Sequence, residues 1–255
     1  MYLEAVSVCV GYSDFLAEAL QFNRPLFDRW LIVTAPQDEE TRDLCHRHNL
    51  ETLVTDDFYR GGTDFDKARA VDRGLQQLSH RDWVLHVDGD VVLPPHTRTT
   101  LAAADLDPQC LYGCDRVMVR GWERWARLKA SGFLHAYSRS HHFNVCFPGT
   151  YDVGARWADL HAGYAPCGFF QLYHRDGAMR HGIRHRRYPA YGHSDAARTD
   201  MQFALQWDRR QRVLLPELVA LHLESAGAAV GANWAGRTTP RFGPPAPQAR
   251  PGRCY

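Results

Sequence analysis

The chain has 255 residues, 45% of them hydrophobic and 23% charged, and its formal net charge at pH 7 is +1. These values are typical of a globular protein that is long enough to bury a proper core. No stretch approaches the roughly 18 apolar residues of a membrane span. The N-terminus has no basic region, and its apolar run is too short for a signal peptide. The seven cysteines are scattered along the chain and fit reduced thiols better than a disulfide framework. Together these features predict a cytoplasmic protein without a membrane partner.

The first 93 residues alternate strands and helices. Apolar runs predict strands at 5–10, 30–34, 51–55 and 82–87. Helices are expected to begin near Ser13 and at the acidic run 38–40, and helical periodicity covers 66–78. Short connections between alternating strands and helices favour right-handed βαβ units and a largely parallel sheet. We therefore expect an open α/β nucleotide-binding half over residues 1–93.

The pattern is less regular after residue 94. Strands are predicted at 109–119, 167–173 and 218–223, helices at 121–130 and 195–209, and loops over 131–165. The Pro/Gly/Arg-rich segment 243–255 is typical of a disordered tail. The expected organisation is one domain over residues 1–242, in which residues 94–242 form an acceptor and catalytic half.

The stretch VLHVDGDVVLPP (84–95) places two aspartates between apolar runs. Asp88 and Asp90 directly follow the fourth predicted strand, and open parallel sheets bind ligands beyond the carboxyl ends of their strands. Two hard oxygen ligands suit Mg²⁺ or Mn²⁺, which leave coordination positions for substrate phosphates. A turn with two solvated aspartates is the alternative. His222 follows a later apolar strand and is a further ligand candidate, although a hydrogen-bonded core histidine would give the same pattern.

Several segments together resemble metal-dependent nucleotide-sugar glycosyltransferases with the GT-A fold, of the family-2-like kind. The matching segments are the strand Val6–Val10, FDKARAVDRGL (65–75), VDGD (87–90), GFFQLYHR (168–175), TDMQFALQW (199–207), and VALHLES (219–225) with NWAGR (233–237) behind it. The resemblance implies a Rossmann-like open, mostly parallel sheet flanked by helices. It also implies a divalent metal, Mn²⁺ or Mg²⁺, on Asp88, Asp90 and His222, and a nucleotide-sugar donor for which UDP is the usual nucleotide of the family.

The same resemblance implies the residues that contact the nucleotide-sugar. Asp56 matches the position that recognises the base, and Lys67 or Arg69 lies near the nucleotide. Arg237, with Trp234, belongs to a loop that would close over the diphosphate, although simple packing explains the tryptophan equally well. The implied contact set is Tyr12, Asp56, Lys67, Arg69, Asp88, Trp234 and Arg237.

The catalytic base that the resemblance implies is an acidic residue at the start of a late helix. Asp200 is the favoured candidate because DMQF resembles the family's D-x-x-F run, and Asp195 is the alternate. A carboxylate that merely stabilises the helix N-terminus fits either residue. The usual Glu-Asp pair is absent, so inverting and retaining chemistry both stay open.

The two halves of the chain carry opposite charge, which bears on the acceptor. Residues 1–114 hold 10 Lys/Arg and 19 Asp/Glu, whereas residues 115–255 hold 20 and 10. Basic stretches with interleaved aromatic residues occur at 116–129 and 174–189, a pattern that phosphate backbones and stacked bases favour. We therefore expect an anionic acceptor, either DNA with hydroxylated bases, as in phage DNA modification, or a phosphate-bearing or acidic polysaccharide.

Two other functions remain open on the sequence alone. A nucleotidyltransferase would share the sheet and the acidic metal site, but it would normally show a glycine-rich basic signature after the first strand, where this chain has VCVGYSDF. A non-catalytic nucleic-acid-binding module would explain the basic half, but not Asp88, Asp90 and His222 together. Dependence on a metal separates the module from the two enzymes.

Overall fold

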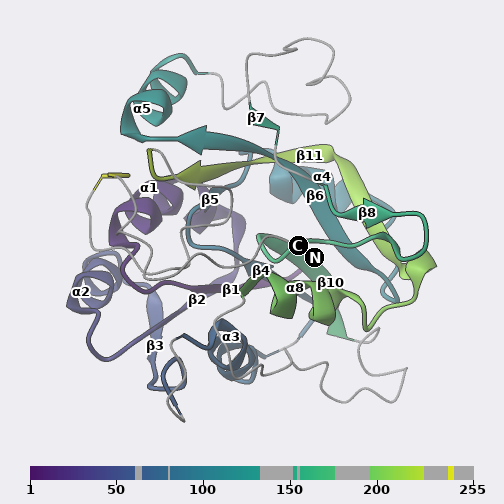
Figure 1. Cartoon of the computed structure of the whole chain (residues 1–255), viewed down its shortest axis with the longest axis horizontal. Coiled ribbons are helices and arrows are strands. Elements are labelled where there is room, and N and C mark those ends of the chain that lie inside the picture. The colour runs from purple at the N-terminus through teal and green to yellow at the C-terminus, as the bar shows by residue number, and fades with distance from the viewer. Residues whose placement is uncertain are drawn as a thin grey trace.

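The computed structural model describes residues 1–60, 65–79, 81–132, 152–153, 156–175, 196–226 and 241–243. Within these residues a nine-stranded sheet runs in the order β3-β2-β1-β4-β10-β6-β11-β5, with β7 paired to β6, and β8 and β9 form a separate hairpin (Figure 1). The strands are β1 (Leu3–Val8), β2 (Arg29–Thr34), β3 (Glu51–Val54), β4 (Trp83–Val87), β5 (Val91–Val92), β6 (Leu111–Arg120), β7 (Asp152–Val153), β8 (Ala158–Asp159), β9 (Gly163–Tyr164), β10 (Phe170–His174) and β11 (Arg212–Glu224).

The sheet is parallel in its first half and mixed in its second. β1 pairs in parallel with β2 and β4, and β2 with β3. β10 then lies antiparallel between β4 and β6, while the long β11 runs parallel to β6 and antiparallel to β5. The predicted open α/β sheet with mostly parallel strands is therefore confirmed.

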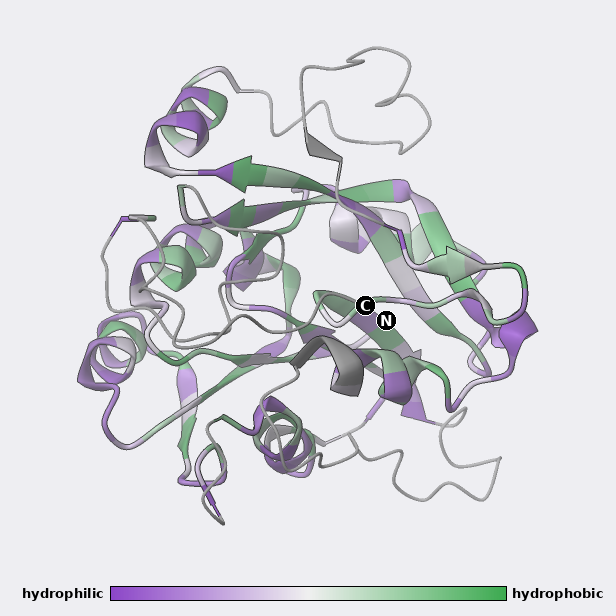
Figure 2. Cartoon of the chain, viewed as in Figure 1, coloured by the Kyte–Doolittle hydropathy of each residue, from purple (hydrophilic) through white to green (hydrophobic). Residues whose placement is uncertain are grey.

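Helices cover both faces of the sheet because successive strand residues alternate between two cores. On one face, Leu3, Ala5 and Ile32 pack with buried residues of α1 (Ser13–Asn23), α2 (Glu39–Arg47) and α5 (Trp122–Ala130). On the other face, Val6 and Val33 pack against α3 (Lys67–Leu75) and α8 (Ala196–Ala204). Apolar residues accordingly follow the strands through the middle of the molecule, and the helices are apolar on their inner sides (Figure 2).

Two helices near the carboxyl ends of the strands begin at aspartate caps. The Asp38 side chain accepts from the backbone N–H of Thr41 at the start of α2, and Asp66 accepts from the backbone N–H of Arg69 at the start of α3. Each cap satisfies a backbone donor that a helix start otherwise leaves unpaired, which fixes where α2 and α3 begin.

The structure differs from the sequence prediction mainly in the second half. The helix α4 (Thr97–Ala103) and the strand β5 were not predicted, and the segment expected to be all loop contains β7, β8 and β9. β11 has 13 residues rather than the six predicted, because its register shifts between Leu215 and Val219 and the strand continues on both sides. The helix expected to reach residue 209 ends at Ala204.

None of the helices in the described part of the chain has the length and apolar character that a bilayer crossing requires. The described cysteines, which are Cys9, Cys45, Cys110, Cys114 and Cys167, are all free thiols. Of the predicted tail 243–255, all but Gly243 lies outside the described residues.

Candidate active site

Asp88 and Asp90 occupy the turn between β4 and β5. The turn is closed by a hydrogen bond from the Val91 N–H to the Asp88 carbonyl (3.2 Å), and the Leu223 N–H on β11 donates to the Asp90 carbonyl (2.8 Å). Because β5 pairs with β11 so that Val91 lies opposite His222, the histidine is placed beside the aspartates. Ligand atoms of Asp88, Asp90 and His222 lie within 4.8 Å of one another, and His222 Nε2 is 3.3 Å from Asp90 Oδ1.

This donor set fits a divalent cation. Two carboxylates with one imidazole match the ligand preference of Mn²⁺ and, less strictly, of Mg²⁺. The side chains of Asp90 and His222 are only 10% and 7% exposed, and carboxylates held this far from water need a neutralising partner. The structure thus brings together the three residues for which the sequence predicted a metal.

Lys67 and Asp200 extend this cluster. Lys67 Nζ is 2.8 Å from Asp88 Oδ1 and 3.3 Å from Asp200 Oδ2, and the lysine and Asp200 side chains are each 10% exposed. The ammonium therefore bridges a predicted metal ligand and the predicted base, and joins α3 to α8. Its two carboxylate neighbours raise the pKa of Lys67 despite its burial, so it stays charged.

Asp200 sits in an environment that suits a proton acceptor. Burial raises its pKa to about 7, with Lys67 opposing the shift and the negative charge of Asp88 adding to it. Its carboxylate lies directly against Gly168, where a Cβ atom would overlap it. The amide of Gln171 on β10 donates to the backbone carbonyls of Asp200 (3.0 Å) and Pro166 (2.9 Å), and so holds the middle of α8 against the 166–171 segment.

The sequence analysis missed three residues at this site. Arg116 on β6 donates a hydrogen bond to His222 Nδ1 (2.8 Å), and its Cζ lies 4.5 Å from the centroid of the Phe169 ring. The Phe169 ring in turn stacks on the His222 ring, with 6.1 Å between the ring centroids. His86 on β4 is fully buried, with Nε2 3.7 Å from Asp88 Oδ1, and burial together with Lys67 lowers its pKa to about 4. The apolar pattern around His86 and Phe169 gave only strand and core signals, and Arg116 was one of many arginines.

The other predicted residues lie outside this cluster or outside the described residues. Tyr12 is buried beside Phe15 at the start of α1, and Asp56 is exposed just beyond β3. Arg69 points to the loop before α3, where it pairs with Asp66 (3.4 Å) and donates to the Arg60 carbonyl (3.2 Å). The structure does not describe residues 195, 234 and 237, so the assignments of Asp195, Trp234 and Arg237 stay predictions.

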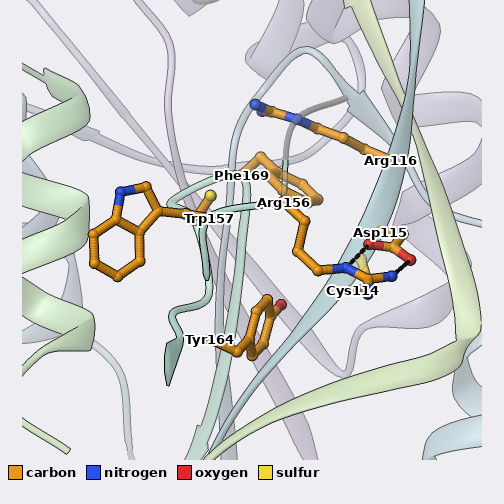
Figure 3. Close-up of a pocket in the computed structure, with 8 residues that line it drawn as sticks. Cys114, Asp115, Arg116, Arg156, Trp157, Tyr164 and Phe169 are labelled. Carbon is orange, nitrogen blue, oxygen red and sulfur yellow. Dashed lines mark hydrogen bonds and ion pairs between the residues drawn. The ribbon is translucent and has the colours of Figure 1, made fainter. Parts of the chain in front are cut away.

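A small hollow that shares Arg116 and Phe169 with the surroundings of His222 has room for about one water molecule, and Figure 3 shows the side chains that line it. Arg156 and Asp115 form a two-bond ion pair within it, and the rings of Trp157 and Tyr164 stand at its side. The residues that line it are Cys114, Asp115, Arg116, Arg156, Trp157, Tyr164, Cys167 and Phe169. Arg116 and Phe169 belong both to this hollow and to the surroundings of His222.

Comparison with solved structures identifies the fold. Glucosyl-3-phosphoglycerate synthase from Mycobacterium tuberculosis, in complex with UDP, matches with a TM-score of 0.50 and 13% identity over 93% of this chain and 76% of that chain. The chain has the GT-A fold. The expectation drawn from the sequence is thereby confirmed at the level of architecture.

Other matches are weaker. The same synthase with Mn²⁺ and UDP-glucose gives a TM-score of 0.47 at 9% identity, over 87% of this chain and 69% of that chain. Mannosyl-3-phosphoglycerate synthase from Rubrobacter xylanophilus gives 0.35 at 22% identity, over 46% of this chain and 41% of that chain. No protein-family model and no curated protein matches the sequence.

Proposed function

We propose that this protein transfers a sugar from a nucleotide-sugar, with UDP as the nucleotide, to a hydroxyl group of an anionic acceptor, with the help of Mn²⁺ or Mg²⁺. The observation that carries the proposal is the convergence of Asp88, Asp90 and His222 at the end of β4 in a GT-A fold. In this fold a ligand is expected beyond the carboxyl ends of the parallel strands, which is where the three residues lie.

The side chains of the cluster suit the steps of sugar transfer. A divalent cation on Asp88, Asp90 and His222 supplies positive charge for the diphosphate that leaves. Asp200 accepts the proton of the attacking hydroxyl, and its pKa of about 7 lies near the value that suits a base at neutral pH. Lys67 keeps the Asp200 carboxylate in place and limits the repulsion between it and Asp88.

The donor is tested by thermal unfolding with UDP, GDP, CDP and ADP, each with and without Mn²⁺. A nucleotide at 100 times its dissociation constant adds about 2.7 kcal/mol to the free energy of unfolding. For a chain of this size that is a rise in Tm of roughly 5–10 °C. We expect the rise with UDP and Mn²⁺ together, and we expect Asp90→Ala to remove it while the exposed control Asp105→Ala keeps it.

The outcomes separate the rival functions. A rise in Tm that needs the metal, followed by slow hydrolysis of UDP-glucose or another UDP-sugar, supports the transferase. Asp200→Asn should then reduce turnover by about 10²- to 10⁴-fold without weakening UDP binding. Asp195→Asn should leave turnover unchanged. A chain whose Tm does not respond to any nucleotide would leave the nucleic-acid-binding module as the better hypothesis.

The DNA acceptor has less support than the rest of the proposal. Within residues 116–129, Arg120 pairs with Glu224 (3.2 Å), Lys129 pairs with Glu18 (2.6 Å), and Trp125 is fully buried. These side chains serve internal contacts rather than an open binding surface. The acceptor hypothesis of DNA or an acidic polysaccharide therefore depends on residues 174–189, of which only residues 174–175 are described.

A further inference from the structure

Residues 241–243, which we call the clasp, dock onto the carboxyl-end edge of the sheet, where ligands of such sheets bind. The Phe242 N–H donates to Asp14 Oδ2 (2.8 Å) in the first turn of α1. The Phe242 carbonyl accepts from the N–H of Ala226 (3.1 Å), just beyond the end of β11. The clasp is the short yellow segment beside α1 in Figure 1, and it joins the start of α1 to the exit of β11.

The Phe242 ring fills a slot between α1 and α5. Phe242 is 1% exposed, and its ring stacks on that of Phe15 with 4.3 Å between the centroids. It also packs at 62° to the Trp122 ring, with 5.5 Å between the centroids, and Arg241 Cζ lies 5.2 Å from the centroid of the same tryptophan. Burial of the ring and the aromatic pairs both favour the docked state. One ring and two backbone hydrogen bonds therefore hold the clasp in place.

The backbone of the clasp is strained. Arg241 and Phe242 have φ angles of 51° and 55°, and residues with a Cβ atom rarely adopt this left-handed conformation. Two such residues in succession persist only where the contacts around them hold them. The contacts of Phe242 are the ones that do so here, and we therefore expect the clasp to open at a lower free energy than the sheet.

Both elements that the clasp joins belong to the expected donor site. Tyr12, a predicted nucleotide contact, directly precedes α1, and its ring lies 5.9 Å from that of Phe15, on which Phe242 stacks. Asp14 also accepts from the Phe15 N–H (3.0 Å), so the carboxylate that binds the clasp orders the first turn of α1 as well. β11, whose exit the clasp holds, carries His222. Release of the clasp would loosen the nucleotide end of α1 and the metal end of β11 together.

We propose that Phe242 is a positioning residue of the donor site, and that a nucleoside diphosphate with its metal ion binds more tightly when the clasp is docked. The inference rests on the proposed function and assigns part of the donor affinity to a residue that acts through Phe15 and Asp14. By linkage, the diphosphate stabilises the docked clasp by the same factor by which the clasp strengthens binding. An open clasp lowers the apparent affinity in proportion to the fraction of molecules that are docked.

Hydrogen exchange of the full chain, followed for individual amides by NMR, tests the docking. The amides of Ala226 and Phe242 report on it directly, because each donates one of the two hydrogen bonds of the clasp. We expect UDP with Mg²⁺ to slow exchange at both amides about fivefold or more, and UDP in EDTA to leave them unchanged. In the ligand-free protein, Phe242→Ala should speed exchange at Ala226 about tenfold or more, because burial of the ring is lost.

Calorimetric titration with UDP in Mg²⁺ measures the coupling. Phe242→Ala should weaken UDP binding about fivefold or more and raise KM for the UDP-sugar with little change in kcat. Asp14→Ala removes the acceptor of the clasp without touching its ring and should act in the same direction, whereas Asp14→Asn keeps an acceptor oxygen and should restore most of the affinity. The matched control is Phe22→Ala, a second aromatic residue of α1, whose ring packs against Trp125 at 5.7 Å. It should lower Tm and leave the affinity for UDP unchanged.

Several results would overturn the inference while leaving the proposed function standing. These are wild-type affinity for UDP in both Phe242→Ala and Asp14→Ala, or UDP binding by the wild type that does not slow exchange at Ala226 and Phe242. A loss of UDP affinity in Phe22→Ala as large as in Phe242→Ala would show a general effect of stability instead. If Phe242→Ala does not fold, the comparison of Asp14→Ala with Asp14→Asn decides. A wild type that binds no UDP with any divalent metal contradicts the proposed function, and the inference fails with it.

Discussion

The contact between Gly168 and Asp200 allows a direct test of the site's geometry through Gly168→Ala. The three atoms nearest to a Cβ at position 168 are Oδ2, Cγ and Oδ1 of Asp200, and all lie within 3.0 Å, where real Cβ contacts essentially never occur. The carboxylate cannot simply turn away, because Lys67 binds its Oδ2 and Gln171 holds the backbone of the same residue. The added methyl group must therefore push α8 or break the Lys67 contact.

The expected cost follows from overpacking. An extra methyl group in a tightly packed site destabilises the folded state by about 1–3 kcal/mol. A glycine-to-alanine change also reduces the entropy of the unfolded chain, which stabilises the protein by about 0.4–1 kcal/mol. We expect Gly168→Ala to lower the free energy of unfolding by about 1–2 kcal/mol, which is roughly 2–8 °C in Tm. Turnover should fall as well, because the displaced carboxylate is the proposed base.

A double-mutant cycle with Asp200→Ala is the decisive assay, read by urea unfolding. Without the carboxylate there is no overlap, so in that background Gly168→Ala should be neutral or stabilise by up to about 1 kcal/mol, and the two substitutions should couple by about 1–3 kcal/mol. Equal costs of Gly168→Ala in both backgrounds would refute the packing of Asp200 against this glycine. Since that packing places the base, its loss would also remove the structural case for Asp200.

Three further predictions concern the charges of the site and the basic stretch. The pKa of Asp200 in the folded state is raised to about 7 from 3.8, so its contribution to stability is complete below pH 3.8 and is lost as pH rises through 7. The Tm of the wild type should therefore fall between pH 5 and pH 8 relative to that of Asp200→Asn. Turnover of the wild type should rise over the same pH range. Lys67→Met leaves two nearby carboxylates without their shared cation, so we expect it to destabilise the metal-free protein by about 3–5 kcal/mol. Mn²⁺ should then raise the Tm of this variant more than it raises the Tm of the wild type. An equal rise in both proteins would contradict the shared role of the lysine. Lys129→Gln should lower Tm slightly, by the loss of a partly exposed ion pair with Glu18, and should leave the affinity for DNA measured by fluorescence anisotropy unchanged.

The first half of the fold could be predicted because its signals are local. Each strand from β1 to β4 is a short apolar run, each helix between them has an acidic start, and Asp88 and Asp90 interrupt the apolar pattern where a ligand is expected. The predicted boundaries differ from the observed ones by up to three residues, since hydrophobic runs continue past the last ladder hydrogen bond. In β1, for example, Cys9 is still buried after the strand has ended at Val8.

The second half could not be predicted to the same extent because its elements are defined by partners far away in the sequence. β11 continues across Pro216 and Glu217 only because β6 offers a parallel edge on both sides of the irregularity. Arg116 is one arginine among many until the pairing of β6 with β11 brings it to His222. His222 was a ligand candidate because it follows an apolar run, but that pattern fits a core histidine equally well, and the family resemblance was needed to imply a metal ligand.

The formal charges of the cluster indicate an order of binding. Above pH 7, where Asp200 is ionised, Asp88, Asp90 and Asp200 face two cations, Lys67 and Arg116. The cluster alone is then net negative by one charge and attracts a metal ion more than it attracts a diphosphate. With a divalent cation the balance becomes positive by one, and near a protein surface a pair of unit charges 4 Å apart contributes about 4 kcal/mol. The doubly negative diphosphate of a nucleotide-sugar is then attracted where it was repelled before. We therefore expect the metal to bind first, and UDP to bind measurably only in its presence, as calorimetric titrations in Mg²⁺ and in EDTA would show.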